Sequence, residues 1–207
     1  MKNEQKKNTR NPYIIVVIAA AMAIFALCWS FFAKPAAQPA DGIGIHHAEI
    51  VVRDYGTIKV ELDGNTAPIS VENFINLAKE GFYDGLTFHR IIKGFMIQGG
   101  DPSKNGTGGS GQQIIGEFAL NGYENNISHV RGTLSMARSK SYNSASSQFF
   151  IVQTDSTYLD GQYAAFGHVT EGMEIVDQIC KDAQVEDANG TVLPANQPVI
   201  TEIRIVK

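Results

Sequence analysis

The sequence predicts a mainly β domain, a closed antiparallel barrel capped by two α-helices and preceded by one N-terminal transmembrane helix. Three observations lead to this fold class. Short apolar runs recur through residues 45–207 between clusters of Gly, Asn, Asp and Ser, as in barrels of short strands. Two segments of the same region carry apolar residues at helical spacing. One long uncharged segment lies near the N-terminus.

Composition and charge exclude some function classes. The chain of 207 residues is 43% apolar, which is enough for a hydrophobic core. Residues 1–12 carry four basic side chains and one acidic, a net charge of +3, which leaves −7 for the rest of a chain whose total is −4. A domain this acidic is not expected to bind nucleic acid through a basic face. The two cysteines, Cys28 and Cys180, are not expected to pair, because Cys28 lies in the uncharged segment.

Residues 13–33 predict a membrane anchor. The segment has 21 residues without a charged side chain, and at ~1.5 Å per residue it spans roughly the 30 Å hydrocarbon core of a bilayer. The basic segment, residues 1–12, predicts a cytoplasmic N-terminus. We therefore expect a single-pass protein of the cell membrane whose following domain is extracytoplasmic. Two alternatives stay open, a cleaved signal peptide and lipidation at Cys28, although no small-residue cleavage site is evident and both neighbours of Cys28 are bulky.

The rest of the chain divides into a linker, residues 34–44, and a folded domain, residues 45–207. Pro35 and Pro39 stiffen the linker, while its glycines loosen it.

Alternation of apolar and polar residues predicts the strands of this domain. Ile58, Val60 and Leu62 alternate with polar residues, and residues 49–53 precede them across a turn at 54–56, which predicts a hairpin. The further predicted strands are residues 87–92, 95–98, 132–137, 148–153, 164–169 and 199–206.

Two helices are predicted. Val71, Phe74 and Leu77 recur at helical spacing, Pro68 suits the first turn of this helix and Gly81 suits its C-terminal end. Residues 173–181 fit a second helix.

Five sequence blocks in a fixed order carry a resemblance to a known family. The longest, residues 88–101, reads FHRIIKGFMIQGGD. The others are NGTGG at 105–109, GTLSMA at 132–137, SQFFI at 147–151, and LDG at 159–161 followed by FG at 166–167. With these blocks the chain resembles the cyclophilin-type peptidyl-prolyl cis/trans isomerases over residues 45–207.

This resemblance implies an eight-stranded barrel with its active site on the outer wall, and an enzyme that needs no metal or cofactor. Carried over by position, Arg90 is the catalytic residue. The implied substrate-binding residues are Phe95, Met96, Phe150 and Leu159 around the proline ring, Gln98, Ala137 and Gln148 along the substrate backbone, and Gly106 beside a neighbouring pocket. The implied partners are unfolded or flexible polypeptides that contain proline, among them exported proteins as they fold.

Three positions depart from the best-known eukaryotic pattern of the family. Tyr158 stands where that pattern has Trp, Tyr163 where it has His, and Arg138 where it has Asn. These changes recur in sequences that resemble bacterial cyclophilins. We count all three residues as substrate-binding, and we expect weak binding of cyclosporin-type inhibitors with catalysis retained.

Arg90 suits the reaction on physical grounds. An X–Pro bond isomerises slowly because twisting the amide sacrifices resonance, with a barrier of ~18–20 kcal/mol. Catalysis requires tighter binding of the twisted amide than of either planar form. The twisted nitrogen regains a lone pair, and a permanent cation with several rigidly placed donors stabilises it.

The same residues also have plainer interpretations. An arginine in a strand usually forms a surface ion pair, and His89 is expected to be a structural, hydrogen-bonded histidine. Phe95 and Met96 are consecutive, so they point to opposite faces unless the strand ends or bends near Gly94. The rival function is a non-catalytic module that binds proline-containing peptides.

Several other motifs are set aside. Residues 106–111 fit G-x-G-x-x-G, but no strand precedes them and no helix follows, as a dinucleotide site requires. The pair His46 and His47 has no further metal ligands nearby, and the Ser-rich run 139–147 lacks a nucleophile elbow.

Overall fold

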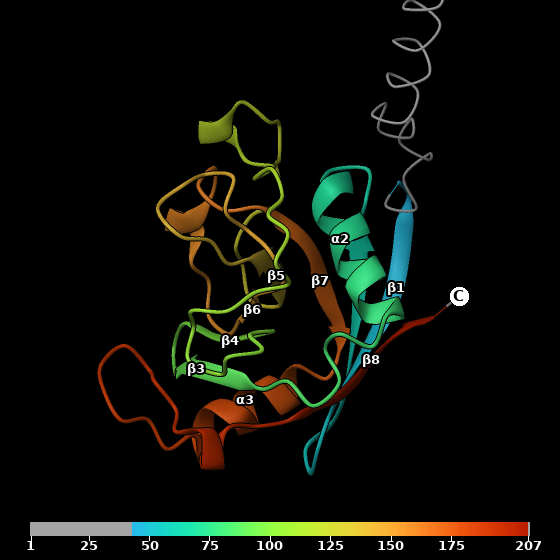
Figure 1. Ribbon diagram of the computed structural model, residues 1–207. Coiled ribbons are helices and arrows are strands. Elements are labelled where there is room, and N and C mark those ends of the chain that lie inside the picture. Colours follow the sequence, from blue (N-terminus) through green and yellow to red (C-terminus); the bar gives the residue numbers. More distant parts are fainter. Residues whose placement is uncertain (1–42, 207) are drawn as a thin grey trace, which may run out of the picture. The chain divides into compact units, whose positions relative to one another are not determined.

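Eight strands form one antiparallel sheet in the computed structural model, which describes residues 43–206 (Figure 1). The strands are β1 Ile45–Val52, β2 Gly56–Asp63, β3 Phe88–Ile92, β4 Met96–Gly99, β5 Thr133–Met136, β6 Phe149–Val152, β7 Ala165–Glu171 and β8 Ile200–Val206. Their order across the sheet is β3-β4-β6-β5-β7-β2-β1-β8. Every strand predicted from the sequence is present, with bounds that differ by only a few residues.

The sheet curls around one apolar core. Ile58, Val60 and Leu62 of β2 are fully buried, which confirms the predicted alternation. Phe74 contacts Phe149 edge-on, with 5.3–5.4 Å between its ring centroid and those of its aromatic neighbours. Side chains alternate between the two faces of each strand, so those that point away from this core are available for a surface site.

Helix α2, Pro68–Lys79, packs against the sheet through Val71, Phe74 and Leu77, as the periodicity predicts. Its first turn is held by the buried carboxylate of Glu117, which accepts hydrogen bonds from the backbone N–H of Ile69 (2.9 Å) and of Ser70 (2.7 Å). A carboxylate at this end is favoured because the first amides of a helix have no partner within the helix.

The second helix, α3, covers Met173–Asp182 and buries Val176 and Ile179. Three short 3-10 helices also occur among the described residues, at Ala119–Asn121, Thr157–Leu159 and Pro194–Asn196.

The predicted closed barrel is wrong, because the two edge strands β3 and β8 share no continuous ladder. The seam between them is bridged by the isolated pair Thr87 and Val199, and by hydrogen bonds such as Phe88 N–H to Pro198 C=O at 3.0 Å. Pro198 has no N–H to donate, so a regular ladder cannot continue through this point. The sheet is thus an open, strongly curled half-barrel.

Within residues 43–206, no helix has the length and apolar character that crossing a membrane requires. The predicted anchor, residues 13–33, and the basic segment, residues 1–12, lie outside the described residues.

Candidate functional site

The candidate site is built on the hairpin of β3 and β4. Arg90 and Gln98 are direct cross-strand partners in this hairpin. Arg90 Nη1 donates a hydrogen bond to Gln98 Oε1 at 3.1 Å, and Arg90 Nε donates to the carbonyl oxygen of Asn189 at 2.8 Å. The half-buried guanidinium is therefore fixed from two sides by uncharged acceptors.

A cavity of about 200 Å³ opens beside this guanidinium. It is lined by Arg90, Phe95, Met96, Gln98, Ala137, Arg138, Phe150, Leu159 and Tyr163. Six of these nine residues are apolar or aromatic, and Arg90, Gln98 and Arg138 add polar groups to the lining. The size and character of the cavity suit a small ring such as that of proline.

Phe95 and Met96 share the cavity because β4 begins only at Met96. Phe95 lies in the preceding turn, where its N–H donates to the carbonyl oxygen of Ile92 at 2.9 Å. Gly94 has a φ of +81°, a left-handed conformation that glycine adopts without strain. Phe95 therefore lies outside the strand, which meets the condition that the strand end or bend near Gly94.

Phe150 lines the cavity, and its ring packs against two further aromatic rings. The ring of His129 stacks on it with 6.0 Å between centroids, and Tyr163 meets it edge-on at 6.0 Å. His129 is held by Asp160, with Nδ1 and Oδ1 2.8 Å apart, and by Ser135 Oγ at 3.0 Å from Nε2.

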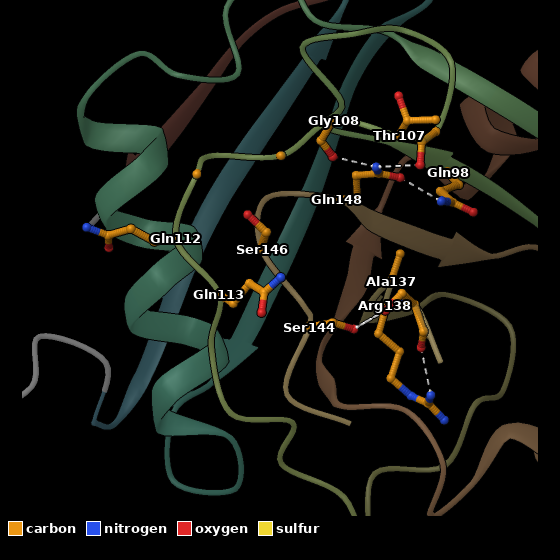
Figure 2. A pocket seen from close by; sticks show the side chains of 14 residues that line it. Gln98, Thr107, Gly108, Gln112, Gln113, Ala137, Arg138, Ser144, Ser146 and Gln148 are labelled. Carbon is orange, nitrogen blue, oxygen red and sulfur yellow. Dashed lines mark hydrogen bonds between the residues drawn. The ribbon is translucent and has the colours of Figure 1, made fainter. Parts of the chain in front are cut away.

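A second cavity, of about 380 Å³, adjoins the first and shares Gln98, Ala137 and Arg138 with it. Figure 2 shows Gln98 and Gln148 pointing toward one another at one side of this cavity, with Arg138 at the other side. Gln148 Nε2 donates to the carbonyl oxygens of Gly106 (3.1 Å) and Gly108 (2.8 Å). This cavity is lined largely by backbone, serine and glutamine groups, so it suits an extended peptide more than an apolar ligand.

A chain of hydrogen bonds links the two cavities. Gln98 accepts from Arg90 through Oε1 and donates through Nε2 to Gln148 Oε1 at 2.9 Å. Since Gln148 in turn holds the loop at Gly106 and Gly108, the arginine and the loop are tied together by two glutamine side chains.

Arg138 separates the cavities with a guanidinium enclosed by aromatic rings. Its Cζ lies 4.6 Å from the ring centroid of Tyr163 and 5.1 Å from those of Phe118 and Tyr142. Nε donates to the carbonyl oxygen of Gln162 at 2.9 Å. These contacts fix the plane of the guanidinium, a geometry that lysine does not reproduce.

Burial shapes the titration of the groups around the site. It lowers the pKa of the Arg90 guanidinium from its ordinary value, while Tyr163 and the carboxylate of Asp187 act in the opposite direction. Arginine remains protonated in proteins, so the site keeps a permanent cation. Burial also lowers the pKa of His89, an effect that nearby Asp101 opposes.

His89 corrects one expectation. It was predicted to be hydrogen-bonded, but both of its buried ring nitrogens lack a hydrogen-bond partner among the described residues. Its environment favours the neutral imidazole, because desolvation penalises the charged form.

The structure brings together most of the residues predicted for the site. Gly106 and Gln148 line the second cavity and not the first. Tyr158 lines neither; its side chain is 64% exposed and its ring centroid lies 6.0 Å from that of Phe95. Neither His129 nor Asn189 is among the site residues predicted from the sequence. The Asn189-Gly190 pair is a turn signal that could have marked its segment, whereas nothing around His129 in the sequence signals its stacking on Phe150.

Among the described residues, no group of three or more His, Cys, Asp or Glu side chains is arranged to hold a metal ion.

Comparison with known proteins identifies the family of the chain. The family model for cyclophilin type peptidyl-prolyl cis-trans isomerases matches residues 47–207. The peptidyl-prolyl cis-trans isomerase A of Dickeya dadantii is 40% identical over 158 residues, which cover 73% of this chain and 80% of that protein. A peptidyl-prolyl cis-trans isomerase of Helicobacter pylori is 46% identical over 126 residues, covering 60% of this chain and 74% of its own.

Solved structures of cyclophilin-type isomerases are also similar to this chain. The crystal structure of a Cryptosporidium parvum cyclophilin type peptidyl-prolyl cis-trans isomerase matches with a TM-score of 0.70 and 32% identity, over 79% of this chain and 99% of that one. A second structure of that protein, in the presence of the dipeptide Ala-Pro, matches with a TM-score of 0.68 and 32% identity, over 78% of this chain and 99% of that one. The chain therefore belongs to the cyclophilin-type peptidyl-prolyl cis-trans isomerases.

Proposed function

We propose that Arg90 is the catalytic residue of this isomerase and that the 200 Å³ cavity holds the proline ring of the substrate. The observation that carries this proposal is the position of the guanidinium, at the rim of an apolar cavity and fixed by Asn189 and Gln98. The Ala-Pro dipeptide in the Cryptosporidium structure supports a proline-containing substrate.

The mechanism follows from these positions. The cavity anchors the proline ring, and the Gln98–Gln148 pair offers donors and acceptors to the adjoining backbone, so the preceding carbonyl is left free to swing. As the amide twists, its nitrogen regains a lone pair, which the donors of Arg90 stabilise more in the transition state than in the planar states. No bond is made or broken, so the reaction requires neither a nucleophile nor a base.

Arg90→Ala tests the role of the cation. We expect kcat/KM for a proline-containing peptide to fall by about 10²-fold, the loss typical for one oriented donor, with the free energy of unfolding changed by less than about 1 kcal/mol. Arg53→Ala is the control, because Arg53 carries the same side chain in the turn after β1, where it is exposed and lines neither cavity. A folded Arg90→Ala protein with near-normal turnover would refute the assignment.

The rival is a module that binds proline-containing peptides without accelerating their isomerisation. It predicts peptide binding with no turnover in the natural chain. The enzyme is favoured over this binding module because one cavity brings together four residues that the resemblance assigns to the active site: Arg90, Phe95, Gln98 and Phe150.

We also propose that the chain assists the folding of exported proteins from the outer face of a cell membrane, anchored through residues 13–33. The support is the uncharged stretch of that segment and the basic residues before it.

The departures at Tyr158, Tyr163 and Arg138 support a bacterial type of cyclophilin.

Protease added to spheroplasts should digest the domain and leave the N-terminus intact; protection of the domain until the membrane is broken would reverse the topology. The mass of the mature chain separates an anchor from a cleaved signal.

A further inference from the structure

Residues 187–192 lie along the free edge of β3, on the side away from β4. The N–H of Ile91 donates to the carbonyl oxygen of Gly190 at 2.8 Å, and the N–H of Val192 donates to the carbonyl oxygen of His89 at 3.0 Å. Arg90 and Thr191 form an isolated antiparallel bridge. The segment therefore pairs with the backbone on both sides of Arg90.

One carbonyl of this segment holds the arginine side chain. Arg90 Nε donates to the main-chain oxygen of Asn189 at 2.8 Å. Because this acceptor is a backbone group, its direction is set by the conformation of the turn and not by the side chain of Asn189.

The conformation of the turn is set by Asp187. Its Oδ1 accepts hydrogen bonds from the N–H of Asn189 (2.9 Å) and the N–H of Thr191 (3.0 Å), and its Oδ2 accepts from Thr191 Oγ1 at 3.1 Å. Its own carbonyl oxygen accepts from the N–H of Gly190 at 3.1 Å. Asp187 thus constrains the chain on both sides of the Asn189 carbonyl, in the manner of an aspartate that organises a turn.

Close packing keeps the turn in place. Gly190 has a φ of +79°, and a Cβ at this position would overlap the carbonyl oxygen of Ile91 and the side chain of Ile92. Only glycine fits here, so the turn rests directly on the backbone of β3.

We infer that Asp187 is a positioning residue for the isomerase reaction, acting through the Asn189 carbonyl to orient the guanidinium of Arg90. With Nε bound to Asn189 and Nη1 bound to Gln98, the side chain is constrained at two points and Nη2 is left for the substrate. Constraint of this kind lowers the cost of reaching the reactive geometry. The inference rests on the proposed catalytic role of Arg90.

Asp187→Ala in the full chain is the test, with Asp187→Asn as the conservative variant and Glu186→Ala as the matched control. Glu186 is an adjacent exposed carboxylate whose side chain makes no hydrogen bond or ion pair within residues 43–206. We expect Asp187→Ala to lower kcat about tenfold while KM and the affinity for a proline-containing peptide stay within about twofold, because the cavity itself is untouched. Asp187→Asn keeps an oxygen acceptor for the two amides and should restore most of kcat, and Glu186→Ala should behave as the natural chain.

The double variant Arg90→Ala/Asp187→Ala separates this inference from the proposed function. If Asp187 acts through Arg90, the double variant is no slower than Arg90→Ala alone. Unchanged kcat in a folded Asp187→Ala protein, or a further loss in the Arg90→Ala background, would overturn the positioning role. An active Arg90→Ala protein would instead overturn the proposed catalytic role. Should Asp187→Ala not fold, Asp187→Ser, which can accept from one amide, must show an intermediate kcat; natural kcat in that variant would also overturn the inference.

Discussion

Gln98 lies on β4 and Gln148 directly precedes the neighbouring strand β6, and the 2.9 Å hydrogen bond between their side chains joins the arginine of one cavity to the loop of the next. Gln98 is the member that contacts both Arg90 and Gln148, so it couples the proposed catalytic arginine to the part of the site suited to the peptide backbone.

Replacing Gln98 with leucine should therefore weaken both the positioning of Arg90 and the binding of the peptide backbone. We expect Gln98→Leu to lower kcat/KM about tenfold, since Arg90 loses one of its two fixed acceptors and Gln148 Oε1 loses its donor. Steady-state kinetics with a proline-containing peptide measure the change. Gln112→Leu is the control, because Gln112 lines the second cavity from an exposed position without a side-chain hydrogen bond. Equal losses in both variants would show that Gln98 acts only as cavity surface.

The aromatic enclosure of Arg138 predicts a measurable loss of stability on its removal. Arg138→Met keeps the length of the side chain but removes the cation from three rings, and we expect a loss of about 1–2 kcal/mol in the free energy of unfolding. Peptide affinity should fall severalfold, because Tyr163 loses the group packed on its outer face. Urea unfolding and peptide titration provide the two measurements. Lys140→Met, an exposed neighbour, should change neither quantity, and an unaltered Arg138→Met protein would show that the enclosure contributes nothing.

Two buried histidines predict a loss of stability in mild acid. Burial lowers the pKa of His129 and of His89, although Asp160 opposes the shift at His129 and Asp101 opposes it at His89. The unfolded chain therefore binds more protons than the folded one as the pH falls below the ordinary histidine pKa of about 6.5. Stability is at its full value above this pH, and it declines from there down to the lowered pKa values of the folded state.

Urea unfolding at pH 7.5 and pH 5.5 measures this dependence. His129→Gln should reduce the difference in the free energy of unfolding between the two pH values. Peptide affinity should fall over the same range, since His129 supports Phe150. If the stability of His129→Gln still differs between the two pH values as much as that of the natural chain, groups other than His129 cause the pH dependence.

The exposed ring of Tyr158 predicts the response to cyclosporin-type inhibitors, which we propose bind this chain weakly. Tyr158→Trp adds an indole N–H donor and apolar area next to Phe95, and should raise inhibitor affinity roughly ten- to thirtyfold, equivalent to about 1–2 kcal/mol. Turnover on short peptides should change little, because the side chain lies outside both cavities. Inhibitor titration of both proteins, with Tyr158→Phe as the control, decides the point. Equal affinities for the Tyr and Trp proteins would show that another contact limits binding.

Local patterns were sufficient to predict the strands and helices of this domain. Helix α2 was recognisable from its apolar spacing and from Pro68, which are properties of the segment itself. The closure of the barrel was not predictable in this way, since it depends on how the segment before β8 meets β3. Pro198 has no N–H to donate there, so the two edge strands are joined by an isolated bridge and single hydrogen bonds and not by a regular ladder.

The features of the site also differ in how far local sequence predicts them. A strand start after Gly94 could be anticipated, so the shared cavity of Phe95 and Met96 was within reach of the sequence. The roles of the site residues came from the family resemblance, because spacing alone does not show which side chains converge. Contacts between distant segments, such as the stacking of His129 on Phe150 or the hydrogen bond from Arg90 to Asn189, leave no local signal.

The pairing of β1 with β8 has a mechanical consequence. The register places His47 opposite Val206, so the described domain begins and ends at the same end of this antiparallel pair. Force applied between the two ends would unzip β1 from β8 one residue pair at a time, a weaker geometry than shearing every pair at once. A fusion partner joined after the last strand would emerge beside the start of the first, roughly 20 Å along β8 from the seam at Val199.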